Sequence, residues 1–181
     1  MKKDFLNRIL GLVFLLTVSS SCTSNLDFNQ AKTLEVKPNV VANLATFEIT
    51  AAQLAGAGTP PLETSVDFDV FRDTFFQKNL VKAVFDFEID NTTNSEFSIE
   101  IELQTSNGAR LYDFTIDVPA NTTSPIVPKK HQEIFENAGL NSLKSTEKIV
   151  FRITKGLSTG TTINPGSFKL RSSATAYLVI Q

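Results

Sequence analysis

The chain has 181 residues, of which 17 are basic and 19 acidic, so its formal net charge is -2. This balance argues against a nucleic-acid-binding domain, which is normally clearly basic. The single cysteine excludes a disulfide within the chain, so a hydrophobic core must hold the fold together, and the length suffices for one domain. Fifteen phenylalanines and no tryptophan indicate that Phe fills a β-sheet core.

The first 22 residues have the layout of a secretory signal peptide. Lys2, Lys3 and Arg8 form a basic start, residues 9–18 are an apolar run, and three serines lead to Cys22. The apolar run is too short to span a bilayer comfortably, because a transmembrane helix needs about 20 apolar residues. Residues 1–21 are therefore predicted to be a signal peptide.

This leader resembles a bacterial lipoprotein signal, in which the cysteine is lipidated and becomes the mature N-terminus. The resemblance implies acyl chains on Cys22 and a lasting membrane anchor, since each buried methylene contributes about 0.8 kcal/mol. Such signals usually carry Leu three residues before the cysteine and Gly or Ala directly before it, where this chain has Ser19 and Ser21. Plain secretion after cleavage by the ordinary signal peptidase is the alternative.

The next segment is polar and has no sustained period of 2 or 3.6. Residues 22–37 are therefore predicted to be the lipidated N-terminus and a flexible tether, followed by one domain over 38–181. Within that domain, 39–50 is a predicted strand and 51–61 a Gly- and Pro-containing loop. Residues 63–71 alternate as a half-buried strand does.

The middle of the chain predicts three strands, 81–89, 97–103 and 112–118, because apolar and polar residues alternate throughout. Asn107-Gly108 is a strong hairpin signal, since both residues tolerate positive φ. A turn is also predicted over 91–95. The three strands are thus expected to form an antiparallel meander with one apolar face.

The last third is less regular. Residues 130–138 are predicted to form one or two helical turns ended by Gly139, with His131 exposed at their start. Strands are predicted over 149–153 and 168–180, the latter with a bulge or bend at Ser172 and Ser173. About seven short strands separated by turn residues predict an all-β, antiparallel Ig-like β-sandwich with one short helical turn.

A second resemblance supports the sandwich. The layout from Val84 through 91–94, the Asn107-Gly108 hairpin and 118–120 is similar to that of late-embryogenesis-abundant type 2 domains. Those domains usually have Asn-Pro-Asn after the first of these strands, and this chain lacks the proline. The resemblance implies a β-sandwich and adds no activity.

No catalytic motif is present. His131 is the only histidine, and a lone His cannot build a zinc site without cysteines or clustered carboxylates beside it. No serine lies in a nucleophile elbow, and no glycine-rich loop follows a strand and opens a helix. The chain is therefore predicted not to be an enzyme.

The polar face of the predicted meander would gather carboxylates. Its register would place Glu102 opposite Asp113 and Asp86 opposite Glu100, and like charges directly opposite are destabilising. Three compensations stay open: Ca²⁺, which takes six to eight oxygens, a basic partner, or neighbouring cations, either Lys148 and Arg152 or Lys169 and Arg171. The predicted acidic binding face consists of Asp86, Glu88, Glu100, Glu102, Asp113 and Asp117.

These features predict a non-catalytic envelope lipoprotein, located at the outer membrane or cell surface, that binds another envelope protein through a sheet edge or the acidic face. No nucleic acid is expected as a partner, and no cofactor besides the lipid on Cys22. The alternative is a carbohydrate-binding or carbohydrate-processing module of a surface uptake system. Phe71, Phe75 and Phe76 would favour that alternative if they were exposed together, although they could equally cap the core.

Overall fold

The structure is a computed structural model that describes residues 35–55, 60–121, 125–156 and 165–181. The chain divides into two units, Met1–Glu35 with Gln181, and Val36–Ile180. The predicted signal peptide, Cys22 and most of the predicted tether lie outside the described residues. The second unit begins at Val36, two residues before the predicted domain start, because Val36 pairs with Ile180 through two backbone hydrogen bonds of 3.0 and 2.9 Å.

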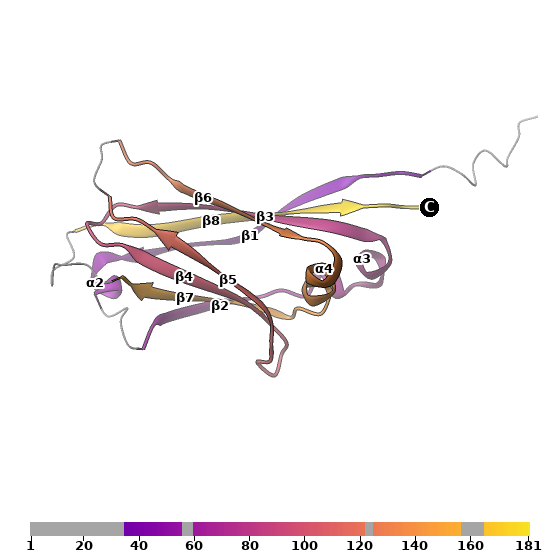
Figure 1. The fold of residues 1–181 in the computed structure, drawn as a ribbon, viewed down its shortest axis with the longest axis horizontal. Helices are drawn as coiled ribbons and strands as arrows, with labels where there is room; N and C mark the ends of the chain where they lie inside the picture. The colour runs from indigo at the N-terminus through magenta and orange to yellow at the C-terminus, as the bar shows by residue number, and fades with distance from the viewer. Residues whose placement is uncertain (1–34, 56–59, 122–124, 157–164) are drawn as a thin grey trace, which may run out of the picture. The chain divides into compact units, whose positions relative to one another are not determined.

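The Val36–Ile180 unit consists of two four-stranded antiparallel sheets packed face to face (Figure 1). The first sheet has the order β1 (Asn39–Thr50), β8 (Ser167–Leu178), β3 (Leu80–Asn91), β6 (Lys129–Phe135). The second sheet has the order β2 (Leu62–Asp67), β7 (Lys148–Lys155), β4 (Phe97–Gln104), β5 (Arg110–Val118). The predicted all-β antiparallel sandwich is confirmed.

Its strand order is that of a jelly roll, in which two Greek keys wind through both sheets. An Ig-like sandwich has a different order and typically seven strands. Eight strands are described here, against about seven predicted. The difference includes β6, a segment predicted to be helical.

The predicted meander is wrong at its first turn, because β3 and β4 belong to different sheets. Asn91 organises the crossing between them: its Nδ2 donates to the carbonyls of Ser95 (2.7 Å) and Pro119 (2.8 Å), and its Oδ1 accepts from the Thr93 N–H (3.0 Å). Apolar alternation indicates which face of a strand is buried, but an inward face suits either a neighbour in the same sheet or a strand in the facing sheet. The predicted register of the β4–β5 hairpin is confirmed where Glu102 lies opposite Asp113.

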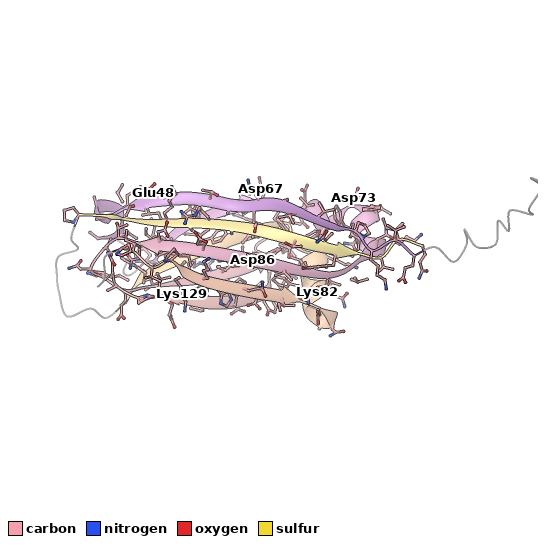
Figure 2. The ribbon with its side chains drawn as sticks, turned by 90° about the horizontal axis from the view of Figure 1, so that it is seen from above. Glu48, Asp67, Asp73, Lys82, Asp86 and Lys129 are labelled. Carbon is pink, nitrogen blue, oxygen red and sulfur yellow. The ribbon has the colours of Figure 1, made fainter. Side chains whose placement is uncertain are left out.

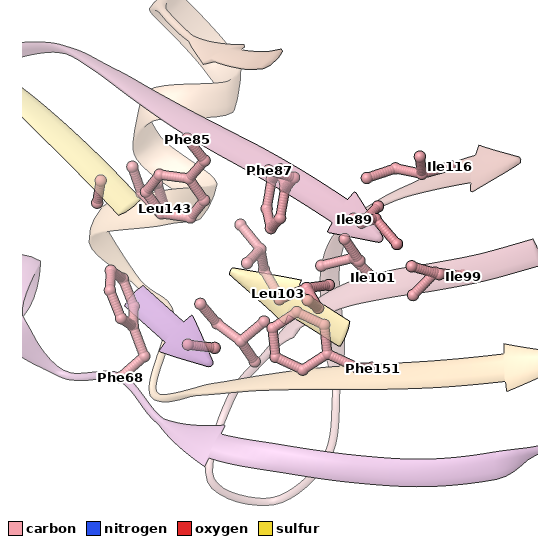
Figure 3. Close-up of a cluster of buried hydrophobic side chains, with 14 of the residues drawn as sticks. Phe68, Phe85, Phe87, Ile89, Ile99, Ile101, Leu103, Ile116, Leu143 and Phe151 are labelled. Atoms are coloured by element: carbon pink, nitrogen blue, oxygen red, sulfur yellow. The ribbon is translucent and has the colours of Figure 1, made fainter. Parts of the chain in front are cut away.

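The core lies between the sheets (Figure 3). Phe85 and Phe87 project from β3 and are at most 2% exposed, like Phe151 from β7. Edge-to-face contacts join the layers, for example between Phe47 and Phe151, whose ring centroids are 5.4 Å apart. Burial of each such side chain contributes about 1.5–3 kcal/mol, so the many phenylalanines serve mainly as sheet filling.

In the described part of the chain, four short helical segments connect the strands: α2 (Ala51–Leu54), the 3-10 turn η2 (Val70–Arg72), α3 (Thr74–Asn79) and α4 (Asn137–Lys144). The helical turns predicted over 130–138 are wrong. That segment is mostly β6, which pairs with β3 and buries Phe135 completely. The helix begins two residues before Gly139, the residue predicted to end it. Within the described ranges, none of the helices has the length and apolar character needed to cross a membrane.

The irregularity predicted at Ser172 and Ser173 lies in the neighbouring strand. β8 is continuous there, whereas β1 shifts register between Asn43 and Ala45. The buried Ser172 hydroxyl accepts from the Ala45 N–H and lies 3.0 Å from the Ala45 carbonyl oxygen, to which it donates. A side chain thus satisfies the backbone groups that the bulge in β1 leaves unpaired.

Candidate functional site

The predicted acidic face does not exist as one surface. Asp86 and Glu88 lie on β3 in the first sheet, whereas Glu100 and Glu102 on β4, with Asp113 and Asp117 on β5, belong to the second. The predicted opposition of Asp86 and Glu100 is therefore wrong: Asp86 pairs with Gln132 and Ser173, and Glu100 with Thr115 and Arg152. The six carboxylates form two groups on the two outer faces of the sandwich.

On the second sheet, Glu102 is the best enclosed carboxylate, with a side chain only 2% exposed. Arg110 and Arg152 both pair with it, and Gln104 Nε2 donates to its other oxygen. The same arginines reach the surrounding acids: Arg110 lies 3.2 Å from Glu100, and Arg152 lies 3.0 Å from Glu63. Arg110 and Arg152 therefore balance the charge of these neighbouring carboxylates within the second sheet.

On the first sheet, Arg171 is the central cation. Its guanidinium lies 2.6 Å from Glu88 and 2.8 Å from Asp90, and Lys130 Nζ lies 3.5 Å from Glu88. The Arg171 hydrogen bond, which outweighs burial, together with the charge of Lys130, lowers the pKa of Glu88 from its ordinary value. Arg152 and Arg171 were among the cations considered from sequence, whereas Arg110 and Lys130 were missed. Lys130 was missed because its strand was predicted to be helical.

No group of three or more His, Cys, Asp or Glu side chains in the described part of the chain is arranged to hold a metal ion. The acidic residues are separated by the arginines that pair with them. These contacts pair the described carboxylates with cations of the chain itself.

A hollow of about 700 Å³ lies on the outer face of the first sheet. Figure 2 looks onto this sheet, with Asp86 near the middle of β3. The residues that line it are polar apart from Phe87, and within the described ranges no hydrogen bond engages the side chains of Asn43, Thr46 or Ser173. Gln132 donates to Asp86 at 2.8 Å beside them. The sequence indicated Asp86, Glu88 and Arg171 but not Asn43, Thr46 or Ser173, because only the strand order places β1 and β8 in the same sheet as β3.

A third feature lies where the edge strands β5 and β6 face each other across the sandwich. Tyr112 donates a 2.5 Å hydrogen bond to Glu133 Oε1, and His131 Nε2 lies 3.1 Å from Glu133 Oε2. The His131 ring stacks on Phe114 at 5.5 Å. The prediction of an exposed His131 at a helix start is therefore wrong, since it is a half-buried strand residue.

The Glu133 carboxylate shifts the pKa of the Tyr112 hydroxyl. The hydrogen bond to Glu133, followed by burial, raises the pKa of Tyr112 to about 12. A neutral tyrosine, a carboxylate and an imidazole thus close the open side of the sandwich. The raised pKa means that Tyr112 acts as the hydrogen-bond donor in this contact.

The three aromatic residues considered for carbohydrate stacking are not exposed together. Phe71 is 3% exposed, Phe76 is half-buried against it with ring centroids 5.3 Å apart, and only Phe75 faces outward at 45%. Phe71 and Phe76 therefore cap the core.

No protein-family model matches the chain, and no curated protein matches its sequence. Among solved structures, the chain is similar to the VP2 subviral particle of infectious bursal disease virus, with a TM-score of 0.48 and 9% identity over 78% of this chain and 32% of that one. It is also similar to desmodium yellow mottle tymovirus, with a TM-score of 0.32 and 11% identity over 81% and 90%.

A third similar structure contains the CBM22-1 and GH10 modules of Clostridium thermocellum xylanase 10B, with a TM-score of 0.29 and 10% identity over 75% of this chain and 25% of that one. The chain spans about a third of the VP2 chain. At these identities the likeness concerns the fold alone.

Proposed function

We propose that this protein is a non-catalytic lipoprotein of the bacterial cell envelope, anchored through Cys22, whose β-sandwich binds another envelope protein. The observation that carries the proposal is the placement of the only cysteine directly after a basic and apolar leader. Acyl chains there give a stable anchor, because two or more chains together far exceed the marginal membrane affinity of one. The outer membrane or cell surface is the expected location.

The two sheets have four edge strands, β1, β6, β2 and β5, and an edge strand can pair with a strand of a partner protein. Natural edge strands are guarded by charge, short length or bulges. β2 has six residues, β5 contains Arg110 and two Asp, and β6 begins with two lysines. β1 has 12 residues, and Glu48 is its only charged residue. Of the features that oppose pairing with another strand, β1 has only the bulge between Asn43 and Ala45. We assign to β1 the binding of an extended, largely neutral segment of another envelope protein, which would add a strand to the first sheet.

The anchor is tested by intact mass of the membrane-extracted protein, compared with Cys22→Ala. A diacyl or triacyl increment on a chain starting at Cys22 supports the proposal, and an unmodified soluble chain overturns it. The β1 edge is tested by pull-down from the native envelope with Val41→Lys, because an added lysine opposes strand addition. Val127→Lys, at a 76% exposed position away from β1, is the matched control. Equal recovery of the same partner with both variants would remove the edge from the proposal.

A second candidate function, carbohydrate binding, is favoured by the hollow on the first sheet. Asn43, Thr46 and Ser173 offer amide and hydroxyl groups there without hydrogen-bond partners among the described residues. Screening against a glycan array with Asn43→Ala tests this alternative, and Asn141→Ala, on an exposed position of α4, serves as the control. Glycan binding that Asn43→Ala abolishes and Asn141→Ala retains would support it.

A further inference from the structure

The exposed apolar side chains gather at one end of the sandwich. β1 and β3 begin at this end, and β8 and β6 end there, because all four strands are antiparallel neighbours. Among the described residues, every large apolar side chain that is exposed lies in this half except Ile126 and Val127. Scattered exposed apolar residues are normal on soluble domains, but an uneven distribution indicates a contact surface.

We define the tether-proximal patch by the members of this group nearest the point where the chain enters the domain. Val36 pairs with Ile180 at the tip, and the other members lie on β1, η2, α3, β3 and β8 at the same end. The patch consists of Val36, Val40, Val70, Phe75, Val81 and Tyr177.

Phe75 is the largest side chain of the patch, and its position is held firmly. The Asp73 carboxylate accepts a 2.8 Å hydrogen bond from the Phe75 N–H and caps α3. Gln77 Nε2 ties the same helix to the carbonyls of Phe71 and Lys144, both at 2.8 Å. Phe71 and Phe76 enter the core from this segment while Phe75 stays 45% exposed. Its exposure therefore comes from a fixed helix.

The chain that leads into the patch indicates that a membrane surface covers it. If Cys22 is lipidated, residues 23–35 connect the acyl chains to Val36. Thirteen residues that behaved as a random coil would have a root-mean-square span of about 20 Å. The tether-proximal end is therefore the end held near the bilayer, and a tethered surface needs little intrinsic affinity to stay bound.

The charges at this end favour an apolar contact over an electrostatic one. Lys82 lies 3.0 Å from Glu136, and Arg72 lies 3.3 Å from Glu147, so two of the cations are already paired. Lys82 Nζ also lies 5.9 Å above the Tyr177 ring. Tyrosine is enriched at the membrane–water interface, and long lysine stems cover apolar surface while the ammonium stays in water.

We propose that the tether-proximal patch rests on the membrane surface, with Phe75 inserted into the interfacial region of the bilayer. This inference rests on the proposed anchoring through Cys22, since the tether is what brings the patch to the lipid. It gives the domain a preferred orientation: β1 begins near the membrane, and Val127, next to the start of β6, lies at the opposite end of the sheet.

The absence of tryptophan from the chain allows a direct test. Phe75→Trp and Val127→Trp each place one tryptophan in the mature lipidated protein, which is reconstituted into phosphatidylcholine vesicles with or without brominated acyl chains. The expected result is a blue-shifted emission that brominated lipid quenches for Phe75→Trp, and a water-exposed, unquenched emission for Val127→Trp. Tyr177→Trp provides a second reporter should Phe75→Trp fail to fold.

Equal, unquenched emission at both ends of a vesicle-bound protein would overturn the orientation and leave the patch to a protein partner. Intact mass of the same sample separates this failure from that of the proposed function. Acyl chains on Cys22 without quenching contradict only the patch proposal. A sample without acyl chains contradicts both.

Discussion

The hydroxyl of Tyr112 donates a 2.5 Å hydrogen bond to Oε1 of Glu133, and this contact joins β5 of the second sheet to β6 of the first. These strands are consecutive along the chain but are edges of different sheets, so they share no backbone ladder and side chains fill the space between them. Tyr112 and Phe135 pack edge to face in the same place, with ring centroids 5.3 Å apart. This side of the sandwich is thus closed by a cluster of aromatic and polar side chains.

Tyrosinate formation at Tyr112 is predicted to require strongly alkaline pH. In a Tyr177→Phe background, Tyr112 is the only tyrosine, and its absorbance change should report a pKa of about 12. Glu133→Gln should lower that value toward the ordinary tyrosine value of about 10, because the hydrogen bond to the carboxylate is the main cause of the shift.

The same shift predicts the direction of a stability change. A pKa raised in the folded state means that folding favours the neutral phenol. This contribution is complete below the unfolded pKa of about 10. It is lost as the pH rises toward the folded pKa of about 12. Between these two pH values, the free energy of unfolding measured in urea should fall less for Tyr112→Phe than for the parent protein. Equal decreases for the two proteins would contradict the raised pKa of Tyr112.

Glu102→Gln is predicted to destabilise the fold by about 1–3 kcal/mol, because Arg110 and Arg152 would lose the charge they share and a buried polar group would lose its partners. Asp117→Asn is the control on the same sheet, since its contact with Ser98 Oγ is exposed, and it should change stability by no more than about 0.5 kcal/mol. Both values come from urea denaturation. Similar small losses for the two variants would show that the arginines rehydrate freely.

Asn91→Ala is predicted to loosen the crossing between the sheets. It removes two donated hydrogen bonds, to Ser95 and Pro119. The Pro119 carbonyl loses this donor, and the Ser95 carbonyl keeps a 3.3 Å hydrogen bond from the Thr93 hydroxyl, so the expected loss is about 1–3 kcal/mol in total. Hydrogen exchange should accelerate at Thr93, whose N–H loses its acceptor. Asn141→Ala on the exposed face of α4 should leave both stability and exchange unchanged.

Two glycine substitutions are predicted to act in opposite directions. A Cβ at Gly166 would lie 2.6 Å from Thr92 Oγ1 and 3.0 Å from the Thr92 carbonyl oxygen, so Gly166→Ala should lower the thermal midpoint. At Gly139, inside α4, the nearest atom lies 3.8 Å away, and Ala should raise stability by about 0.5–1 kcal/mol through helix propensity. A neutral Gly166→Ala would mean that the Thr92 loop yields at no cost.

Local chemistry alone determined much of this fold. Alternation in β3, β4 and β5 identified the inward faces correctly except at Val81, which was predicted to face inward and is 48% exposed beside the register shift at the start of β3. Burial of Phe85 or Ile101 depends only on the period of two in a strand. Asn107-Gly108 set the β4–β5 hairpin, and Gly108 has the positive φ of 81° that such a turn requires. The composition likewise assigned phenylalanine to the core.

The polar edge strand β6 could not be predicted from alternation. β6 contains two lysines, His131 and Glu133 and lacks a clean apolar face, so its pattern could not distinguish a strand from a helical turn. Pairing with β3 and burial of Phe135 are tertiary effects that override local preference.

Only the tertiary structure decided which strands are neighbours, and the surfaces depend on that choice. The sequence by itself determined the faces of Glu88 and Glu102, the leader pattern that ends at Cys22 and the class of the fold. The jelly-roll winding then placed Glu88 beside Arg171 and Glu102 beside Arg152 on opposite sides of the sandwich. The physical reason is that side-chain alternation encodes burial, whereas lateral order arises from closing two sheets around one core.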